Sequence, residues 1–131
     1  LAATAQTAVG SGVDTALVAL DARMNEVFTG AFEVNSEGLM APVAAEKVCP
    51  PEEVTVPAGL QVYGIGNGFE RYAALAELSG QLREIRADIW PRASSVLQLA
   101  QAWLKTNEPL SAEQAQPVYL RDNVATKERD R

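Results

Sequence analysis

A hairpin pattern near the start of the chain constrains its fold more than any other feature. Residues 16–20 (Ala-Leu-Val-Ala-Leu) form an unbroken apolar run, which is typical of a strand buried on both faces of a sheet. The charged turn Asp21-Ala22-Arg23 follows, and residues 26–34 then form a second run rich in β-forming side chains. Two strands joined by a charged turn predict an antiparallel hairpin, which residues 35–38 (Asn-Ser-Glu-Gly) close so that a third strand can follow.

The rest of the chain predicts alternating strands and helices with breaks at glycine and proline. Because a central strand does not accept proline, Pro42 places the third strand at an edge of the sheet. A helical interpretation of residues 82–87 stays open beside the strand interpretation. The expected elements are a helix over residues 1–9, a third strand over 39–48, a short helical turn from Pro51, a fourth strand over 61–65, a helix over 69–78, a fifth strand over 82–89, a helix from Pro91 and an extended segment over 117–121.

This order predicts an α/β fold: three antiparallel strands followed by β-α-β-α, in a mixed five-stranded sheet with flanking helices. It is the order of one RNase H-like half of the superfamily of actin, heat-shock chaperones and sugar kinases. The helix after Pro91 carries an apolar stripe that is expected to face the core, and Trp90 and Trp103 are interpreted as core or groove fillers. The stripe consists of Val96, Leu97, Ala100, Trp103 and Leu104.

Composition excludes several classes of function. The 131 residues fit one domain, and a net charge of -6 without a basic stripe makes direct binding of a phosphate backbone unfavourable. The chain has no histidine, which removes Ser-His and Cys-His nucleophile pairs and histidine metal sites and argues against an enzyme. A single cysteine, Cys49, excludes an internal disulfide and agrees with a cytoplasmic protein. No apolar run approaches the roughly 18 residues of a membrane span.

The glycine-rich loop at residues 64–68 (Gly-Ile-Gly-Asn-Gly) is a candidate nucleotide site. It lies between a predicted strand and a predicted helix, where backbone amides can receive phosphate. The dinucleotide fingerprint fails because position 69 is Phe, and the Walker motif fails because no Gly-Lys-Ser/Thr follows. A plain tight turn is therefore preferred, and Gly64, Gly66 and Gly68 remain the cofactor-binding candidates. No metal and no cofactor are expected.

Two segments resemble the bacterial TsaB family. Residues 20–28 (Leu-Asp-Ala-Arg-Met-Asn-Glu-Val-Phe) are similar to its "(I/L)DARMxEVY" segment. Residues 116–125 (Gln-Pro-Val-Tyr-Leu-Arg-Asp-Asn-Val-Ala) are similar to its "PVYLRNNVA" ending. Both occur in the family's order, and the resemblance extends from residue 1 to about residue 127. The residues of these segments that are interpreted as structural are Asp21, Arg23, Glu26, Pro117, Tyr119 and Arg121.

Local contacts are expected in both segments. Arg23 is expected to pair with Asp21 or Glu26, since the turn lacks the glycines that let a backbone approach phosphate. In the second segment, Val118 and Leu120 are expected to pack on the sheet, while Tyr119 and Arg121 tie down loops.

The resemblance implies the C-terminal half of a TsaB-like protein, with the N-terminal subdomain absent, an RNase H-like subdomain over residues 1–127 and a charged flexible tail over 122–131. It implies a cytoplasmic, non-catalytic scaffold that binds and supports a TsaD-like subunit, with a TsaE-like ATPase in the complex, in making threonylcarbamoyladenosine beside the tRNA anticodon. Contact with tRNA is then indirect, and the full-length protein can form a homodimer. The alternatives are an ATP-binding kinase-like domain, an inactive glycoprotease-like homologue and a self-associating structural module.

Overall fold

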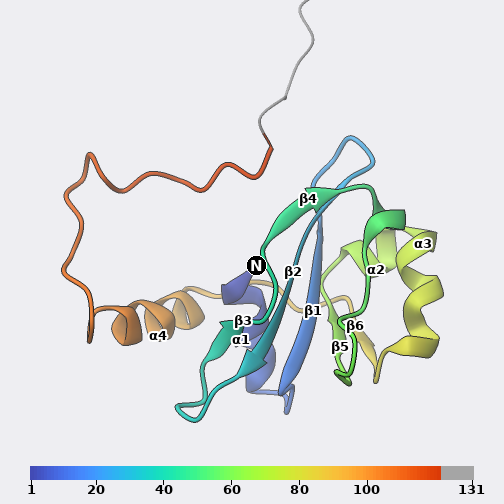
Figure 1. Ribbon diagram of the computed structural model, residues 1–131, viewed down its shortest axis with the longest axis horizontal. Coiled ribbons are helices and arrows are strands. Elements are labelled where there is room, and N and C mark those ends of the chain that lie inside the picture. The colour runs from blue at the N-terminus through green and yellow to red at the C-terminus, as the bar shows by residue number, and fades with distance from the viewer. Residues whose placement is uncertain (122–131) are drawn as a thin grey trace, which may run out of the picture.

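A mixed β-sheet forms the centre of the structure, a computed structural model that describes residues 1–121 (Figure 1). The strand order is β3-β2-β1-β5-β6, and a further strand, β4, also pairs with β2. The strands are β1 (Thr15–Asp21), β2 (Val27–Val34), β3 (Met40–Pro42), β4 (Lys47–Cys49), β5 (Tyr63–Ile65) and β6 (Ile85–Arg86). The helices are α1 (Ala2–Val9), α2 (Gly68–Arg71), α3 (Ala73–Ala76) and α4 (Ala93–Trp103), with the 3-10 helices η1 (Pro51–Glu53) and η2 (Glu77–Gln81).

The predicted hairpin and fold class are confirmed. Strands β1 and β2 pair antiparallel from Thr15 opposite Glu33 to Asp21 opposite Val27. Strand β1 then pairs parallel with β5, and β5 pairs parallel with β6, so the sheet is mixed. The first five residues of β1 are buried, because β1 lies in the middle of the sheet with packed side chains on both faces.

Successive β1 side chains enter two cores on opposite faces of the sheet, as the two-residue period of a strand requires. On one face Leu17 packs in a cluster that includes Phe69 of α2 and Leu75 of α3. On the other face Val18 packs in a cluster with Phe32 and with residues of α1. Helix α1 and the pair α2–α3 therefore cover opposite faces of the sheet (Figure 1).

The predicted third strand is split into two. Strands β3 and β4 pair with the two ends of β2, with Pro42 opposite Phe32 and Cys49 opposite Val27. The register shifts by two residues between these ladders, and residues 43–46 form an exposed connection. The predicted edge position is confirmed for β3, which is the first strand of the sheet order. Pro42 is its last residue, and because β3 has a neighbouring strand on one side only, the missing N–H of proline removes no hydrogen bond between central strands.

The predicted helix over residues 69–78 is wrong as a continuous element. Tyr72 is extended (φ -119°, ψ 122°) and separates α2 from α3, and the chain continues as η2. The interruption has a tertiary cause, because the Tyr72 hydroxyl donates a hydrogen bond of 2.7 Å to the Asp21 carboxylate. The fifth strand is correct in kind, but only residues 85–86 pair, as β6.

Helix α4 forms where the sequence predicts it, but its orientation contradicts the prediction. Ser95 is its buried residue, and Leu99 and Ala102 are half-buried, whereas the apolar stripe that was expected in the core is exposed. Trp90 is 57% exposed and Trp103 is 44% exposed, so neither fills the core. The cause lies in the contact surface, because α4 rests on α1 through small and polar side chains such as Thr7, which bonds Ser95 at 2.8 Å.

Residues 117–121, for which an extended segment was predicted, form no helix or strand, and their side chains pack differently from the prediction. Val118 is 81% exposed and Tyr119 is 74% exposed, and only Leu120 and Arg121 are half-buried. The predicted tail over 122–131 lies outside the described residues. Within residues 1–121, no helix combines the length and the apolar character needed to cross a membrane.

Candidate functional site

The β1–β2 turn has an unusual backbone. Arg23, Met24 and Asn25 all have left-handed φ values, of 62°, 54° and 58°. For a residue with a Cβ, this conformation costs roughly 1 kcal/mol or more. The turn is closed by hydrogen bonds from Ala22 N to Glu26 O (2.9 Å) and from Glu26 N to Arg23 O (3.0 Å). Three strained residues in a row persist only where the surroundings hold them, and the contacts of Asp21 provide that support.

Asp21 makes the largest number of polar contacts at this turn, with Arg23, Asn67, Arg71 and Tyr72. Its Oδ1 accepts hydrogen bonds from the Arg23 N–H (2.9 Å) and the Tyr72 hydroxyl (2.7 Å), and its own N–H donates to Asn67 Oδ1 (3.0 Å). Its Oδ2 lies 3.6 Å from a guanidinium nitrogen of Arg23 and 3.8 Å from one of Arg71. The Asp21 side chain is only 8% exposed, which is tolerable because the carboxylate has these partners.

The same contacts shift two ionisation equilibria. The hydrogen bond from Tyr72, followed by the one from the Arg23 N–H, lowers the pKa of Asp21 because both stabilise the carboxylate. That hydrogen bond raises the pKa of Tyr72, since a phenolate could not donate it and would face a negative charge. Asp21 is thus held as an anion that positions its neighbours, and Tyr72 as a neutral donor.

Arg121 reaches the same turn from the other end of the chain. One guanidinium nitrogen donates to Ala22 O at 3.0 Å and the other lies 3.4 Å from Arg23 O, so two carbonyl groups of the turn gain a donor. Arg121 also forms an ion pair with Glu26, and its guanidinium lies 5.9 Å from the centre of the Phe28 ring. The two segments that resemble TsaB therefore meet in space although 99 residues separate Arg121 from Ala22.

The structure brings together some of the sequence-predicted residues and leaves others apart. Asp21, Arg23, Glu26 and Arg121 form one network, whereas Pro117 and Tyr119 are exposed. Sequence reasoning missed three partners of Asp21: Asn67, Arg71 and Tyr72. Tyr72 fitted the apolar side of a continuous helix and Asn67 lay among glycines, so neither position carried a signal for contact with a residue about 50 positions earlier.

The glycine loop lies directly against strand β1. A Cβ on Gly66, whose φ is +105°, would lie 2.7 Å from the Ala19 carbonyl oxygen, and one on Gly68 would lie 2.8 Å from the same atom. A Cβ on Gly64 would lie 3.0 Å from Leu82 and Phe69 side-chain atoms. The glycines thus allow the loop to pack on backbone and side chains, and α2 after it has only four residues. This geometry favours the tight-turn interpretation over a phosphate site.

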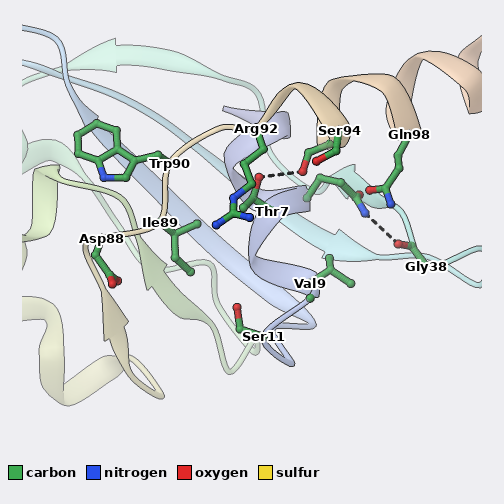
Figure 2. Close-up of a pocket in the computed structure, with 13 residues that line it drawn as sticks. Thr7, Val9, Ser11, Gly38, Asp88, Ile89, Trp90, Arg92, Ser94 and Gln98 are labelled. Atoms are coloured by element: carbon green, nitrogen blue, oxygen red, sulfur yellow. Dashed lines mark hydrogen bonds between the residues drawn. The ribbon is translucent and has the colours of Figure 1, made fainter.

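A separate polar cavity of about 650 Å³ lies between α1, α4 and the loop that precedes α4 (Figure 2). Its walls carry the Thr7–Ser95 hydroxyl contact and the side chain of Arg92. Gln6 also lines it, but its amide is engaged, because Nε2 donates to Gly38 O and Oε1 accepts from Met40 N. None of the sequence-predicted site residues lines this cavity. Among the described residues, no cluster of three or more His, Cys, Asp or Glu side chains could hold a metal ion.

The strand order and the antiparallel β1–β2–β3 meander followed by parallel β5 and β6 define an RNase H-like α/β unit. YeaZ from Pseudomonas aeruginosa matches this unit with a TM-score of 0.75 and 35% sequence identity, over 92% of this chain and 55% of that one. A second structure, of a Pseudomonas aeruginosa protein described as similar to peptidase YEAZ, matches with the same TM-score and identity and covers 56% of that chain.

The tRNA threonylcarbamoyladenosine biosynthesis protein TsaB of Escherichia coli is 30% identical over 121 residues, which is 89% of this chain and 52% of TsaB. TsaB of Haemophilus influenzae is 28% identical over 124 residues, which is 87% of this chain and 50% of that protein. No protein-family model matches the chain. The chain is thus homologous to TsaB/YeaZ proteins over about nine-tenths of its length and spans about half the length of these relatives.

Proposed function

We propose that this chain is the C-terminal half of a TsaB-type subunit, and that the whole subunit supports a TsaD-like partner in making threonylcarbamoyladenosine in tRNA. In this proposal the subunit is a non-catalytic scaffold, the TsaE-like ATPase belongs to the same complex, and tRNA is contacted through the partner. The homology to two TsaB proteins over almost the whole chain supports the assignment to this process.

The observation that carries the proposal is the contact between the two TsaB-like segments. Arg121 of the second segment binds the turn of the first through two carbonyl oxygens and Glu26. The Asp21 carboxylate at the centre of this network accepts hydrogen bonds from the Arg23 N–H and the Tyr72 hydroxyl. Its pKa is lowered by these bonds, which makes it a weak base. An arrangement that fixes backbone shape without a free reactive group suits a scaffold, and the absence of histidine from the sequence points the same way.

The rival function is ATP binding at the glycine loop, and calorimetric titration with ATP or ADP separates the two. We expect no measurable binding to this chain, because Gly66 and Gly68 are packed against the Ala19 carbonyl group. Tight nucleotide binding that is lost in Gly66→Val, while Gly80→Val in open space retains it, would defeat the scaffold proposal.

The partner is tested by capture on immobilised TsaD of Pseudomonas aeruginosa. Three proteins are compared: YeaZ of that bacterium, this chain, and a fusion in which the part of YeaZ that this chain does not match is joined ahead of Leu1. We expect YeaZ and the fusion to bind, and this chain to bind at least tenfold more weakly, since the partner contact is proposed to lie mainly in the other half. Failure of the fusion to bind while YeaZ binds would contradict the assignment, and equal binding of this chain would move the contact to this half.

A further inference from the structure

The polar cavity between α1, α4 and the loop before α4 carries two opposite charges that are not paired (Figure 2). Asp88 and Arg92 both line its wall, and both residues are exposed. Among residues 1–121, neither forms an ion pair, with the other or with a third residue. Arg86, two residues before Asp88, bonds instead to Glu84 at 3.0 Å and to Ser11 O at 2.9 Å. The cavity therefore offers one carboxylate and one guanidinium to a ligand.

The hydroxyl groups at the α1–α4 contact form a chain of hydrogen bonds with one direction. Thr7 Oγ1 donates to the Ala3 carbonyl oxygen at 2.9 Å, which uses its single proton. The 2.8 Å contact between Thr7 and Ser95 must then be donated by Ser95. Ser95 is 5% exposed and lines the cavity, and it has no further proton to donate. Its oxygen is therefore an acceptor, which a ligand would satisfy with an N–H or O–H group.

These groups are spread along the cavity. In Figure 2 the Arg92 guanidinium points into the cavity and lies, in this view, between Asp88 on one side and Thr7 on the other. Thr7 is the hydrogen-bond partner of Ser95, so the acceptor oxygen of Ser95 belongs to the Thr7 side. Gln98 adds a side-chain amide to the lining. The cavity thus presents an anionic acceptor, a cationic donor and a neutral acceptor.

The two opposite charges select among classes of ligand. An anion pairs with Arg92 but is repelled by Asp88, and a cation pairs with Asp88 but is repelled by Arg92. A neutral ligand that fills the cavity removes water from both charges without replacing it by a countercharge, which is costly. A ligand that carries both an ammonium and a carboxylate group provides each side chain with a charge-assisted hydrogen bond.

We propose that this cavity binds a free α-amino acid with a hydrogen-bond donor in its side chain. Arg92 binds the carboxylate, Asp88 binds the ammonium group, and the side-chain donor reaches Ser95 Oγ. The volume of about 650 Å³ lies within the roughly 300–1,000 Å³ of small-molecule sites, so water can share the cavity with such a ligand. The inference goes beyond the proposed function and does not rest on it, because no residue of the turn network lines this cavity.

Titration with L-glutamine and two singly charged analogues tests whether both charges are recognised. N-acetyl-L-glutamine keeps the carboxylate and lacks the ammonium group, and L-glutaminamide keeps the ammonium group and lacks the carboxylate. Trp90 lines the cavity and serves as the fluorescent reporter in a Trp103→Phe background, since Trp103 does not line it. We expect saturable binding of L-glutamine and at least tenfold weaker binding of each analogue. L-Norvaline, whose side chain has no donor, should bind severalfold more weakly.

Matched variants test which end of the ligand each charge binds. Arg92→Gln should weaken L-glutamine binding at least tenfold without weakening that of L-glutaminamide, which has no carboxylate. Asp88→Asn should weaken L-glutamine binding similarly without weakening that of N-acetyl-L-glutamine. Arg83→Gln is the control and should change no affinity, because Arg83 pairs with Asp14 and does not line the cavity. All three substituted residues are exposed, so the variants should fold, which circular dichroism verifies.

Several outcomes would overturn the proposal. N-acetyl-L-glutamine binding as tightly as L-glutamine would show a simple anion site, and equal binding of L-glutaminamide would show a simple cation site. Unchanged L-glutamine affinity in Arg92→Gln or Asp88→Asn would contradict the role of that charge, and equal binding of L-norvaline would contradict the contact with Ser95. Amide chemical shifts of residues 6–11 and 88–98 follow the titration independently of Trp90. Their constancy at about 50 mM L-glutamine, far above a millimolar dissociation constant, would exclude the site.

Discussion

The β1–β2 turn is rich in charged and polar residues, yet its central carboxylate is almost buried, whereas helix α4 is rich in apolar residues, yet leaves them exposed. Asp21 is 8% exposed because five neighbouring groups contact it. Leu97 and Trp103 are 57% and 44% exposed because the surface beneath α4 receives only Ser95, Leu99 and Ala102.

The difference between these regions shows that the burial of a side chain depends more on whether neighbouring groups can contact it than on whether the side chain is polar or apolar. A carboxylate can leave water when every lone pair finds a donor, and the cost of desolvation is then offset. An apolar stripe can leave water only when a matching surface lies opposite. Within residues 1–121, the charged groups of the turn have hydrogen-bonding partners such as Tyr72 and Arg121, whereas no apolar surface covers the stripe of α4.

The largest expected effect compares a leucine in each region. Leu75 of α3 is fully buried, and Leu75→Ala should lower the free energy of unfolding by about 3 kcal/mol, since it removes buried methyl groups and leaves a cavity. Leu97→Ala on the exposed stripe should change it by less than about 0.5 kcal/mol. Urea denaturation followed by circular dichroism measures both. Similar losses in the two variants would show that the α4 stripe is already covered.

The second prediction compares two glycines. Gly66→Ala should cost about 2–3 kcal/mol, because φ is +105° and the new Cβ would lie 2.7 Å from the Ala19 carbonyl oxygen. Gly80→Ala is the control, because a Cβ there meets open space at an ordinary φ, and it should be neutral or raise stability by up to about 1 kcal/mol. The midpoint of thermal unfolding ranks the two variants, and a Gly66→Ala protein as stable as the control would contradict the close packing of this loop on β1.

The smallest expected effect concerns the pH dependence of the turn. Because the pKa of Asp21 is lowered by folding, its carboxylate stabilises the fold above its unfolded pKa of about 3.9, and this contribution is lost as pH falls through the folded value. Asp21→Asn should therefore cost about 1–2 kcal/mol at pH 7 and clearly less at pH 3. Urea denaturation at pH 7, 5 and 3 measures the difference.

Tyr72→Phe supplies the matched control for this prediction. It removes the hydrogen bond that contributes most to the lowered pKa of Asp21, so the variant should lose about 1 kcal/mol at pH 7 and show a weaker pH dependence. An Asp21→Asn penalty that is the same at pH 3 as at pH 7 would mean that the charge of Asp21 does not contribute.

Local patterns predicted much of the fold. The apolar run at residues 16–20 identified the central strand, and the spacing after Pro91 identified a helix whose observed bounds are Ala93–Trp103. Four of the seven side chains in the network at the turn could also be predicted, because Asp21, Arg23, Glu26 and Arg121 lie in the segments that resemble TsaB. Asn67, Arg71 and Tyr72 could not be predicted as partners of Asp21, because Asp21 lies about 50 residues earlier and their own neighbourhoods show no pattern that indicates the contact.

The sequence by itself determined the order of the main strands and helices, the α/β class and the apolar stripe of α4, because these follow from periodicities of two and 3.6 residues and from local breaks. It did not show that the third strand splits into β3 and β4 or that the helix after β5 is interrupted. Only the tertiary structure decided that Tyr72 leaves the helix, that Arg121 meets Ala22 across 99 residues, and that the stripe faces outward. The physical reason is that the environment of a side chain depends on which distant parts of the chain pack beside it. A local pattern indicates whether a residue is apolar, polar or charged, but it does not show which distant residue will contact it.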